Sequence, residues 1–134
     1  MAIPVAFEFQ AAIEARNIEA ALALLAEDVV LHCPVVLREY KGRAAVAPVL
    51  YAIAGVLENF RHVSELRTDD GAGNALMFKA EVAGLELEGC DPVTVNDSGE
   101  IAQLTVMIRP LGAVTALAMA MAILVPRRSI RPAS

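Results

Sequence analysis

Residues 60–96, FRHVSELRTDDGAGNALMFKAEVAGLELEGCDPVTVN, contain the pattern that decides the fold. Apolar side chains recur there at nearly every second position, which is typical of strands with one buried face. The turn sequence Asp69-Asp70-Gly71 separates the first two runs, and Asn96-Asp97-Ser98-Gly99 follows the last one. The pattern predicts four strands, over 60–69, 74–83, 85–96 and 101–109.

The chain before residue 60 has helical spacing instead. We predict a short β-branched strand over 29–33, stopped by Pro34, and a loop or short edge strand over 35–41. Pro48 must lie near the first turns of the helix that contains it, or bend that helix. The predicted helices cover 5–15, 18–26 (ended by Glu27-Asp28), about 43–57, and 110–125 at the end of the chain.

Helices first and a meander of long strands afterwards indicate an α+β fold, with helices on one face of an antiparallel sheet. The length of 134 residues predicts one domain over 1–134. Apolar residues make up 57% of the chain, above the usual share, so we expect a lined cavity or a subunit interface besides the core. Aromatic residues make up only 4%, which predicts aliphatic cavity walls.

Charge and cysteine usage exclude several function classes. The net charge of −5 argues against a nucleic-acid partner, and we interpret the basic tail over 126–131 as a solvated terminus. The two cysteines form no CxxC pair and the two histidines lie far apart, so we expect no metal and no cofactor.

The uncharged run over 111–125 is shorter than the roughly 20 residues of a membrane span. We interpret it as a buried or interface helix and expect no membrane partner. The amino terminus lacks the basic start of a signal peptide and carries Glu8 early, which favours a cytoplasmic protein.

The strand over 85–96 carries one unusual side chain. Its alternation predicts that Leu85, Leu87, Gly89, Asp91, Val93 and Val95 share one face, and Asp91 is the only charged residue in that set. Burial disfavours the charged form of a carboxyl group, so the pKa of Asp91 should be raised. Such carboxyls occur at functional sites and also as structural hydrogen-bond anchors, and both interpretations of Asp91 stay open.

The strand over 101–109 has an apolar face and a mixed face. Ala102, Leu104, Val106 and Ile108 form the apolar face, whereas Gln103, Thr105, Met107 and Arg109 form the mixed one. The mixed face suits a homodimer contact through the outer side of the sheet, with Arg109 at an interface or rim. A bulge before Pro110 would reverse this assignment.

Cys33 shares a face of the strand over 29–33 with Val29 and Leu31, and His32 points the other way. We interpret Cys33 as a small core residue rather than a nucleophile. No neighbouring residue in the sequence would lower the pKa of its thiol and favour the thiolate. Tyr40 and Tyr51 carry phenol groups that could reach a ligand, or could be half-buried rings with a solvated hydroxyl.

The segment LLAEDVVLHCPV over 24–35, followed by YKGRAAV over 40–46, resembles the NTF2-like superfamily, most closely its SnoaL-like polyketide cyclase and ketosteroid isomerase branch. The segment over 89–108 is similar to the same families, and the resemblance covers about 5–125. It implies a cone in which the sheet wraps around a helix and encloses a deep apolar pocket, in a protein that often forms dimers.

The resemblance also implies which site residues are present and which are replaced. The general base of the isomerases falls on Cys33, their tyrosine donor on Phe9, and their supporting tyrosines on Leu25 and Leu50. Only Asp91 matches, as the neutral aspartic acid that donates a hydrogen bond to the substrate oxygen. A steroid-isomerase mechanism lacks its base here. A limonene-type epoxide hydrolase is disfavoured too, because its matching last-strand position falls on Val106.

Three hypotheses follow. The first is an isomerase, cyclase or dehydratase for a small hydrophobic carbonyl compound, with Asp91 as the donor and Cys33 or His32, turned inward by a bulge, as the base. The second is a non-catalytic module that binds a hydrophobic ligand, and the third is a dimerisation module with a vestigial pocket. The alternation of side chains along the strands, together with the resemblance, predicts which residues line the pocket. They are Phe9, Tyr40, Leu50, Val93, Leu104, Val106 and Ile108.

Overall fold

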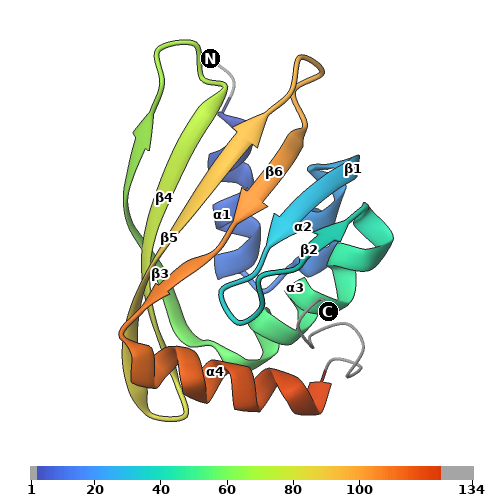
Figure 1. The fold of residues 1–134 in the computed structure, drawn as a ribbon. Coiled ribbons are helices and arrows are strands. Elements are labelled where there is room, and N and C mark those ends of the chain that lie inside the picture. Colours follow the sequence, from blue (N-terminus) through green and yellow to red (C-terminus); the bar gives the residue numbers. More distant parts are fainter. Residues whose placement is uncertain (1–2, 125–134) are drawn as a thin grey trace.

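The fold, described for residues 3–124 by a computed structural model, contains four helices and seven strands (Figure 1). In chain order these are α1 (Val5–Glu14), α2 (Ile18–Ala23), β1 (Leu25–His32), β2 (Glu39–Lys41), α3 (Arg43–Val56), β3 (Glu58–Arg67), β4 (Gly73–Val82), β5 (Leu85–Val95), β6 (Ile101–Thr105), β7 (Met107–Arg109) and α4 (Leu111–Leu124). The predicted tail over 126–131 lies outside the described residues.

The strands form one curved sheet in the order β2-β1-β6-β5-β4-β3, and β7 continues beside β5. The sheet curls around α1, while α4 packs across its end against β4, β5 and β7 (Figure 1). The predicted α+β cone is confirmed. One pair departs from the antiparallel prediction, because β1 runs parallel to β6. The two strands are separated by α3 and the whole meander, so no hairpin constrains their relative direction.

The second helix is shorter than predicted. It ends at Ala23, and β1 begins at Leu25, so Glu27 and Asp28 lie inside a strand rather than at a helix end. The pairing of β1 with β6 is irregular between Leu25 and Val30, and both acidic side chains are exposed there. The prediction was wrong because pairing with a distant strand outweighed the local helical pattern.

The predicted strand over 101–109 is divided at Val106 into β6 and β7. A register shift between β5 and β6 buries Ile101 and leaves Ala102 half-buried, the reverse of the predicted parity. Beyond the shift, Leu104 and Val106 are buried and Ile108 is half-buried, in agreement with the prediction. A one-residue irregularity therefore changes the parity of only the first two positions.

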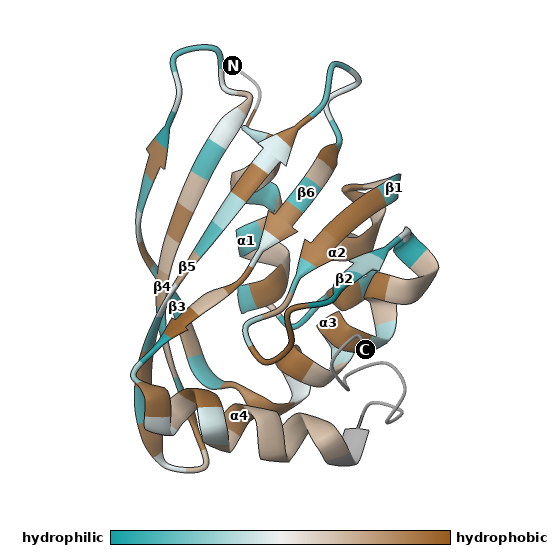
Figure 2. Cartoon of the chain, viewed as in Figure 1, coloured by the Kyte–Doolittle hydropathy of each residue, from teal (hydrophilic) through white to brown (hydrophobic). Residues whose placement is uncertain are grey.

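Buried positions alternate with more exposed ones along β4 and much of β5, and hydrophobic residues are spread over both strands and the helices (Figure 2). The core between the sheet and α1, α3 and α4 includes Phe9, Leu50, Leu76, Leu104 and Leu117, all almost fully buried. Over the described range 3–124, no helix is both long enough and apolar enough to cross a membrane.

Gly89 of β5 lies opposite Phe78 of β4, and the Phe78 ring lies across the glycine. A Cβ atom added at Gly89 would overlap that ring. The absence of a side chain at residue 89 therefore lets a large aromatic ring lie flat on the concave face, two residues from Asp91.

We expect Gly89→Ala to lower the free energy of unfolding by about 1–3 kcal/mol, because the new methyl group must displace the Phe78 ring in a packed interior. Urea unfolding followed by circular dichroism measures this change. Gly112→Ala, at a helical glycine with no atom within 4 Å of the added Cβ, is the control and should be neutral or slightly stabilising. Equal stability of the two variants would contradict the packing account.

Candidate functional site

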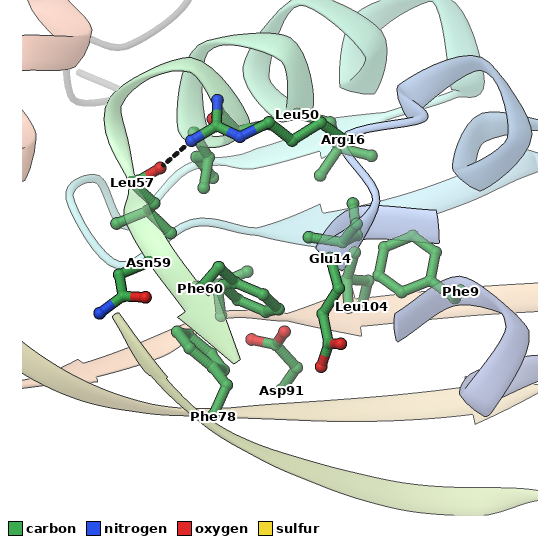
Figure 3. A pocket seen from close by; sticks show the side chains of 14 residues that line it. Phe9, Glu14, Arg16, Leu50, Leu57, Asn59, Phe60, Phe78, Asp91 and Leu104 are labelled. Atoms are coloured by element: carbon green, nitrogen blue, oxygen red, sulfur yellow. Dashed lines mark hydrogen bonds between the residues drawn. The ribbon is translucent and has the colours of Figure 1, made fainter. Parts of the chain in front are cut away.

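A cavity of about 190 Å³ lies between α1, the second half of α3, the start of β3 and the concave face of the sheet (Figure 3). This volume is below the roughly 300–1,000 Å³ of pockets for drug-sized ligands, so the enclosed part suits a smaller molecule. The lining side chains are Phe9, Ile13, Glu14, Arg16, Leu50, Ile53, Ala54, Leu57, Asn59, Phe60, Phe78, Asp91, Leu104 and Val106.

Asp91 is the buried polar group of this cavity. Its side chain is only 7% exposed, and its Oδ1 atom is buried with no hydrogen-bond partner among the described residues. Burial raises the pKa of Asp91 well above the ordinary value of 3.8. The charged form would lose its hydration without gaining a partner, so the group favours the neutral acid, which can donate one hydrogen bond.

Three phenylalanines line the cavity, and two of them, Phe60 and Phe78, lie beside the Asp91 carboxyl group (Figure 3). Phe60 and Phe78 stack with ring centroids 4.7 Å apart and planes inclined by 30°, and Phe9 approaches from α1. The prediction of purely aliphatic walls was wrong. Few aromatic residues are present in the chain, but the fold gathers three of its four phenylalanines at one cavity.

The mouth of the cavity is polar, with Glu14, Arg16 and Asn59 all exposed. Arg16 donates from Nη2 to the Leu57 carbonyl at 2.9 Å and from Nη1 to the Ala54 carbonyl at 3.3 Å. These carbonyls belong to the end of α3, where backbone oxygens lack helical partners. Arg16 therefore ties the turn after α1 to the end of α3 across one side of the mouth.

Glu14 ends α1 on the other side of the mouth. Its Oε1 atom accepts a hydrogen bond from the backbone N–H of His62 at 2.6 Å. His62 lies in the edge strand β3, next to a register shift against β4, where N–H groups are available to partners outside the sheet. This bond fixes the direction of the Glu14 carboxylate relative to the cavity.

The predicted site residues divide into two groups. Phe9, Leu50, Asp91, Leu104 and Val106 line the cavity together. The other five, which are Tyr40, Val93, Ile108, Cys33 and His32, do not line it.

Tyr40 and Val93 lie in one line of paired residues that crosses four strands beside the cavity. In this line Tyr40 pairs with Leu31, Leu31 with Leu104, and Leu104 with Val93. Both side chains are buried. Burial raises the pKa of Tyr40, with a smaller contribution from Cys33, and its hydroxyl has no hydrogen-bond partner within residues 3–124. These residues belong to the core beside the cavity.

Cys33 and His32 have the opposite side-chain directions that alternation along the strand predicts. No bulge turns either side chain toward the cavity. Cys33 is buried, and burial raises its pKa against the opposing effect of a backbone hydrogen bond at Val35. A raised pKa disfavours the thiolate. His32 faces outward, with Nε2 3.6 Å from a Glu39 carboxylate oxygen. Neither residue reaches Asp91's cavity as a base.

Sequence reasoning missed several lining residues. Phe78 could have been found, because antiparallel pairing places it two residues from the partner of Asp91. Glu14 and Arg16 carry no comparable signal, because charged residues at a helix end are ordinarily solvated. Among the described residues, no group of three or more His, Cys, Asp or Glu could hold a metal ion.

Comparisons with known proteins agree with this architecture. A model of the SnoaL-like domain family matches residues 6–104. The chain therefore belongs to the SnoaL-like branch of the NTF2-like superfamily, as its resemblance predicted. No protein of curated function matched the chain.

Two solved structures are similar to nearly the whole chain. One is an uncharacterised bacterial protein with a cystatin-like fold from Silicibacter pomeroyi (32% identity, TM-score 0.84, covering 90% of this chain and 84% of that one). The other is a steroid delta-isomerase from Pseudomonas aeruginosa (30% identity, TM-score 0.84, covering 89% and 87%).

A third solved structure is a candidate polyketide cyclase from Xanthomonas campestris (20% identity, TM-score 0.68, covering 84% of this chain and 93% of that one). At this level of identity the similarity shows the fold alone. The cone is thus shared by relatives whose described activities differ, so function must be argued from the site.

The raised pKa of Asp91 predicts a specific pH dependence of stability. In the folded state Asp91 keeps its proton to higher pH than in the unfolded chain. Its stabilising contribution is therefore full below about pH 4 and is lost as the pH rises through the folded pKa. The amide side chain of the Asp91→Asn variant does not titrate. The free energy of unfolding of this variant minus that of the wild type should therefore increase as the pH rises, by at most about 1.4 kcal/mol per pH unit.

Urea unfolding of both proteins from about pH 4 to about pH 9 measures this difference. Taking the difference between the two proteins removes the contributions of the other acidic residues. A difference that stays constant across that range would show that Asp91 is already ionised in the folded protein.

Proposed function

We propose that the protein binds a small hydrophobic carbonyl compound in this cavity and promotes its enolisation, as an isomerase or cyclase does, with neutral Asp91 donating a hydrogen bond to the carbonyl oxygen. The observation that carries the proposal is the Oδ1 atom of Asp91, which has no hydrogen-bond partner within residues 3–124, on a residue that is only 7% exposed among apolar and aromatic side chains. A ligand oxygen would supply the acceptor that the neutral acid lacks.

The chemistry suits this environment. Charge that develops on a carbonyl oxygen during enolisation is stabilised best by a fixed donor in a site from which water is excluded. Phe9, Phe60 and Phe78 line the cavity together with Asp91 and offer apolar surface to a hydrocarbon body. The similarity to a steroid delta-isomerase supports the reaction class, although the cavity volume favours a molecule smaller than a four-ring compound.

We expect Asp91→Asn to slow deuterium incorporation into small cyclic ketones in D₂O by about 10²–10³-fold, because an amide is a weaker donor to a developing oxyanion. Proton NMR of cyclohex-3-en-1-one incubated with each protein measures the exchange. Asp97→Asn, in the exposed turn after β5, is the matched control and should leave the rate unchanged. An Asp91→Asn rate equal to that of the wild type would overturn the proposal.

Non-catalytic binding is the second candidate function, because neither Cys33 nor His32 reaches the cavity. In that case small cyclic ketones raise the melting temperature of the wild type but are recovered without deuterium. Stabilisation together with exchange favours the catalytic proposal. Stabilisation alone favours the binding module.

We also propose that the outer face of the sheet forms a homodimer. Val63, Met77, Cys90 and Met107 follow one another across β3, β4, β5 and β7, and we call this set the outer stripe. Val63 is 51% exposed and Met107 is 55% exposed. The ion pair between Arg109 and Glu88, at 2.9 Å, borders the outer stripe, as expected of a polar rim.

We expect Met107→Lys to convert a dimer into a monomer, because a charge in the centre of an apolar interface must be desolvated. Sedimentation equilibrium at micromolar concentration measures the mass. The control is Met119→Lys, at a 70%-exposed methionine of α4 rather than of the sheet, which should remain dimeric. A monomeric wild type would exclude this interface.

A further inference from the structure

Helix α4 contains no charged residue along its 14 positions. It lies across one end of the sheet, where it packs against α3, β4, β5 and β7 (Figure 1). Ala113, Leu117 and Met121, spaced four residues apart, are the fully buried side chains on its inner side. The core therefore covers only one side of a helix that is apolar all round, and its other side faces outward.

The outward side of α4 is an apolar surface. Leu111 is 80% exposed, Met119 is 70% exposed, and Thr115 and Ala122 are exposed as well. With 3.6 residues per turn, these four residues fall within about a quarter of the helix circumference, and we call them the α4 stripe. The Thr115 hydroxyl donates to the Leu111 carbonyl at 3.1 Å, so the helix itself uses that proton. The α4 stripe therefore offers mainly hydrocarbon to an outside partner.

The charge of the chain changes sign toward this end. The chain carries a net charge of −5, yet no acidic residue follows Glu100 in the sequence. Arg127, Arg128 and Arg131 come shortly after α4. Three residues of chain reach at most about 10 Å, so the covalent connection alone keeps Arg127 within that distance of Leu124 at the end of the helix. Cations and an exposed apolar helix are thus linked in one segment.

Hydrocarbon together with cations matches a lipid surface that carries negative charge. A helix that lies on a bilayer places its apolar side at the boundary between headgroups and acyl chains, and nearby arginines bind acidic headgroups. A second copy of the chain fits the α4 stripe less well. A helix of this length is about 20 Å long and about 10 Å wide, so it would bury about 200 Å² on each copy. Stable protein interfaces bury about 800 Å² per partner.

We propose that the α4 stripe docks on a membrane surface that contains anionic lipid, with Arg127, Arg128 and Arg131 on the headgroups. The docking does not depend on what the cavity binds. α4 is too short to span a bilayer, but a short helix can lie on its surface. This contact departs from the expectation of no membrane partner, which rests on that length. One shallow apolar side and three cations give reversible binding.

Flotation of the full-length chain with lipid vesicles tests the docking. One set of vesicles is phosphatidylcholine alone, and the other contains about 30% phosphatidylglycerol. We expect the protein to float with the anionic vesicles at about 50 mM salt and to be released at about 500 mM, because salt screens the attraction. It should not float with phosphatidylcholine alone. Failure to float with the anionic vesicles, or equal binding to both sets, overturns the proposal.

A substitution in the α4 stripe locates the contact. Met119→Glu should weaken binding to anionic vesicles by at least about 10-fold, because it replaces inserted hydrocarbon with a carboxylate. Leu66→Glu makes the same change of charge at a 66%-exposed leucine of β3 and should bind as the wild type does. Equal binding by the two variants would place the contact elsewhere on the protein and overturn the proposal.

Substitutions after α4 test the cations. Each cation at an anionic surface contributes about fivefold to binding, so three replacements together should weaken it by about 10²-fold. The replacements are Arg127→Gln, Arg128→Gln and Arg131→Gln. The control makes the same change of charge at three exposed cations of the sheet, Lys41, Arg61 and Lys79. It should bind within a few fold of the wild type. Equal loss in both proteins would assign the binding to net charge, against the proposal.

The mass of the protein in solution separates a lipid surface from a second copy. We expect Met119→Glu to keep the mass of the wild type in sedimentation equilibrium without lipid. If Met119→Glu lowers that mass while Leu66→Glu does not, the α4 stripe is an interface between copies, and the membrane proposal is overturned.

Discussion

The carboxyl group of Asp91 is enclosed by apolar side chains, and the cost of charging it there determines the character of the site. Removing an ion from water without a partner costs several kcal/mol, so the group keeps its proton instead. A neutral acid is a hydrogen-bond donor, which makes the inner wall of the cavity complementary to an oxygen acceptor. The polar groups at the mouth, Glu14 and Arg16, remain in contact with water, and this contrast gives the cavity two chemically different ends.

Several elements far apart in the chain maintain that enclosure. β4 and β5 pair without a register shift, so Leu76 lies opposite Asp91 and holds the carboxyl group on the concave face. Gly89 leaves room for the Phe78 ring, which stacks on Phe60. α1 covers the same face, and the two hydrogen bonds of Arg16 join the turn after α1 to the end of α3. The site therefore depends on the whole cone rather than on one loop, which is consistent with its position on rigid elements.

Much of this architecture could be predicted from the sequence, and the remainder could not, for identifiable reasons. Alternation with period two located three of the long strands and placed Asp91 on the buried face, because side-chain direction in a strand follows directly from parity. It failed at Glu27 and Asp28, where pairing with β6 overrides a helical pattern, and at Ala102, where a register shift changes the parity. Glu14 could not be selected either, because its position at the cavity depends on the backbone of His62 in a distant edge strand. Single-sequence patterns describe local direction well, but they carry little information about which distant backbone group a surface side chain will meet.

The protonation state of Asp91 is the central claim, and the carboxyl carbon of that residue reports it directly. In protein labelled with ¹³C at aspartate carboxyl carbons, with Asp91→Asn used to assign the signal, the chemical shift of this carbon can be followed as the pH is raised from acid to alkaline. The account predicts that the signal keeps the shift of a neutral acid at neutral pH, because burial raises the pKa of Asp91. A signal for Asp91 that already has the shift of a carboxylate at neutral pH would contradict the account.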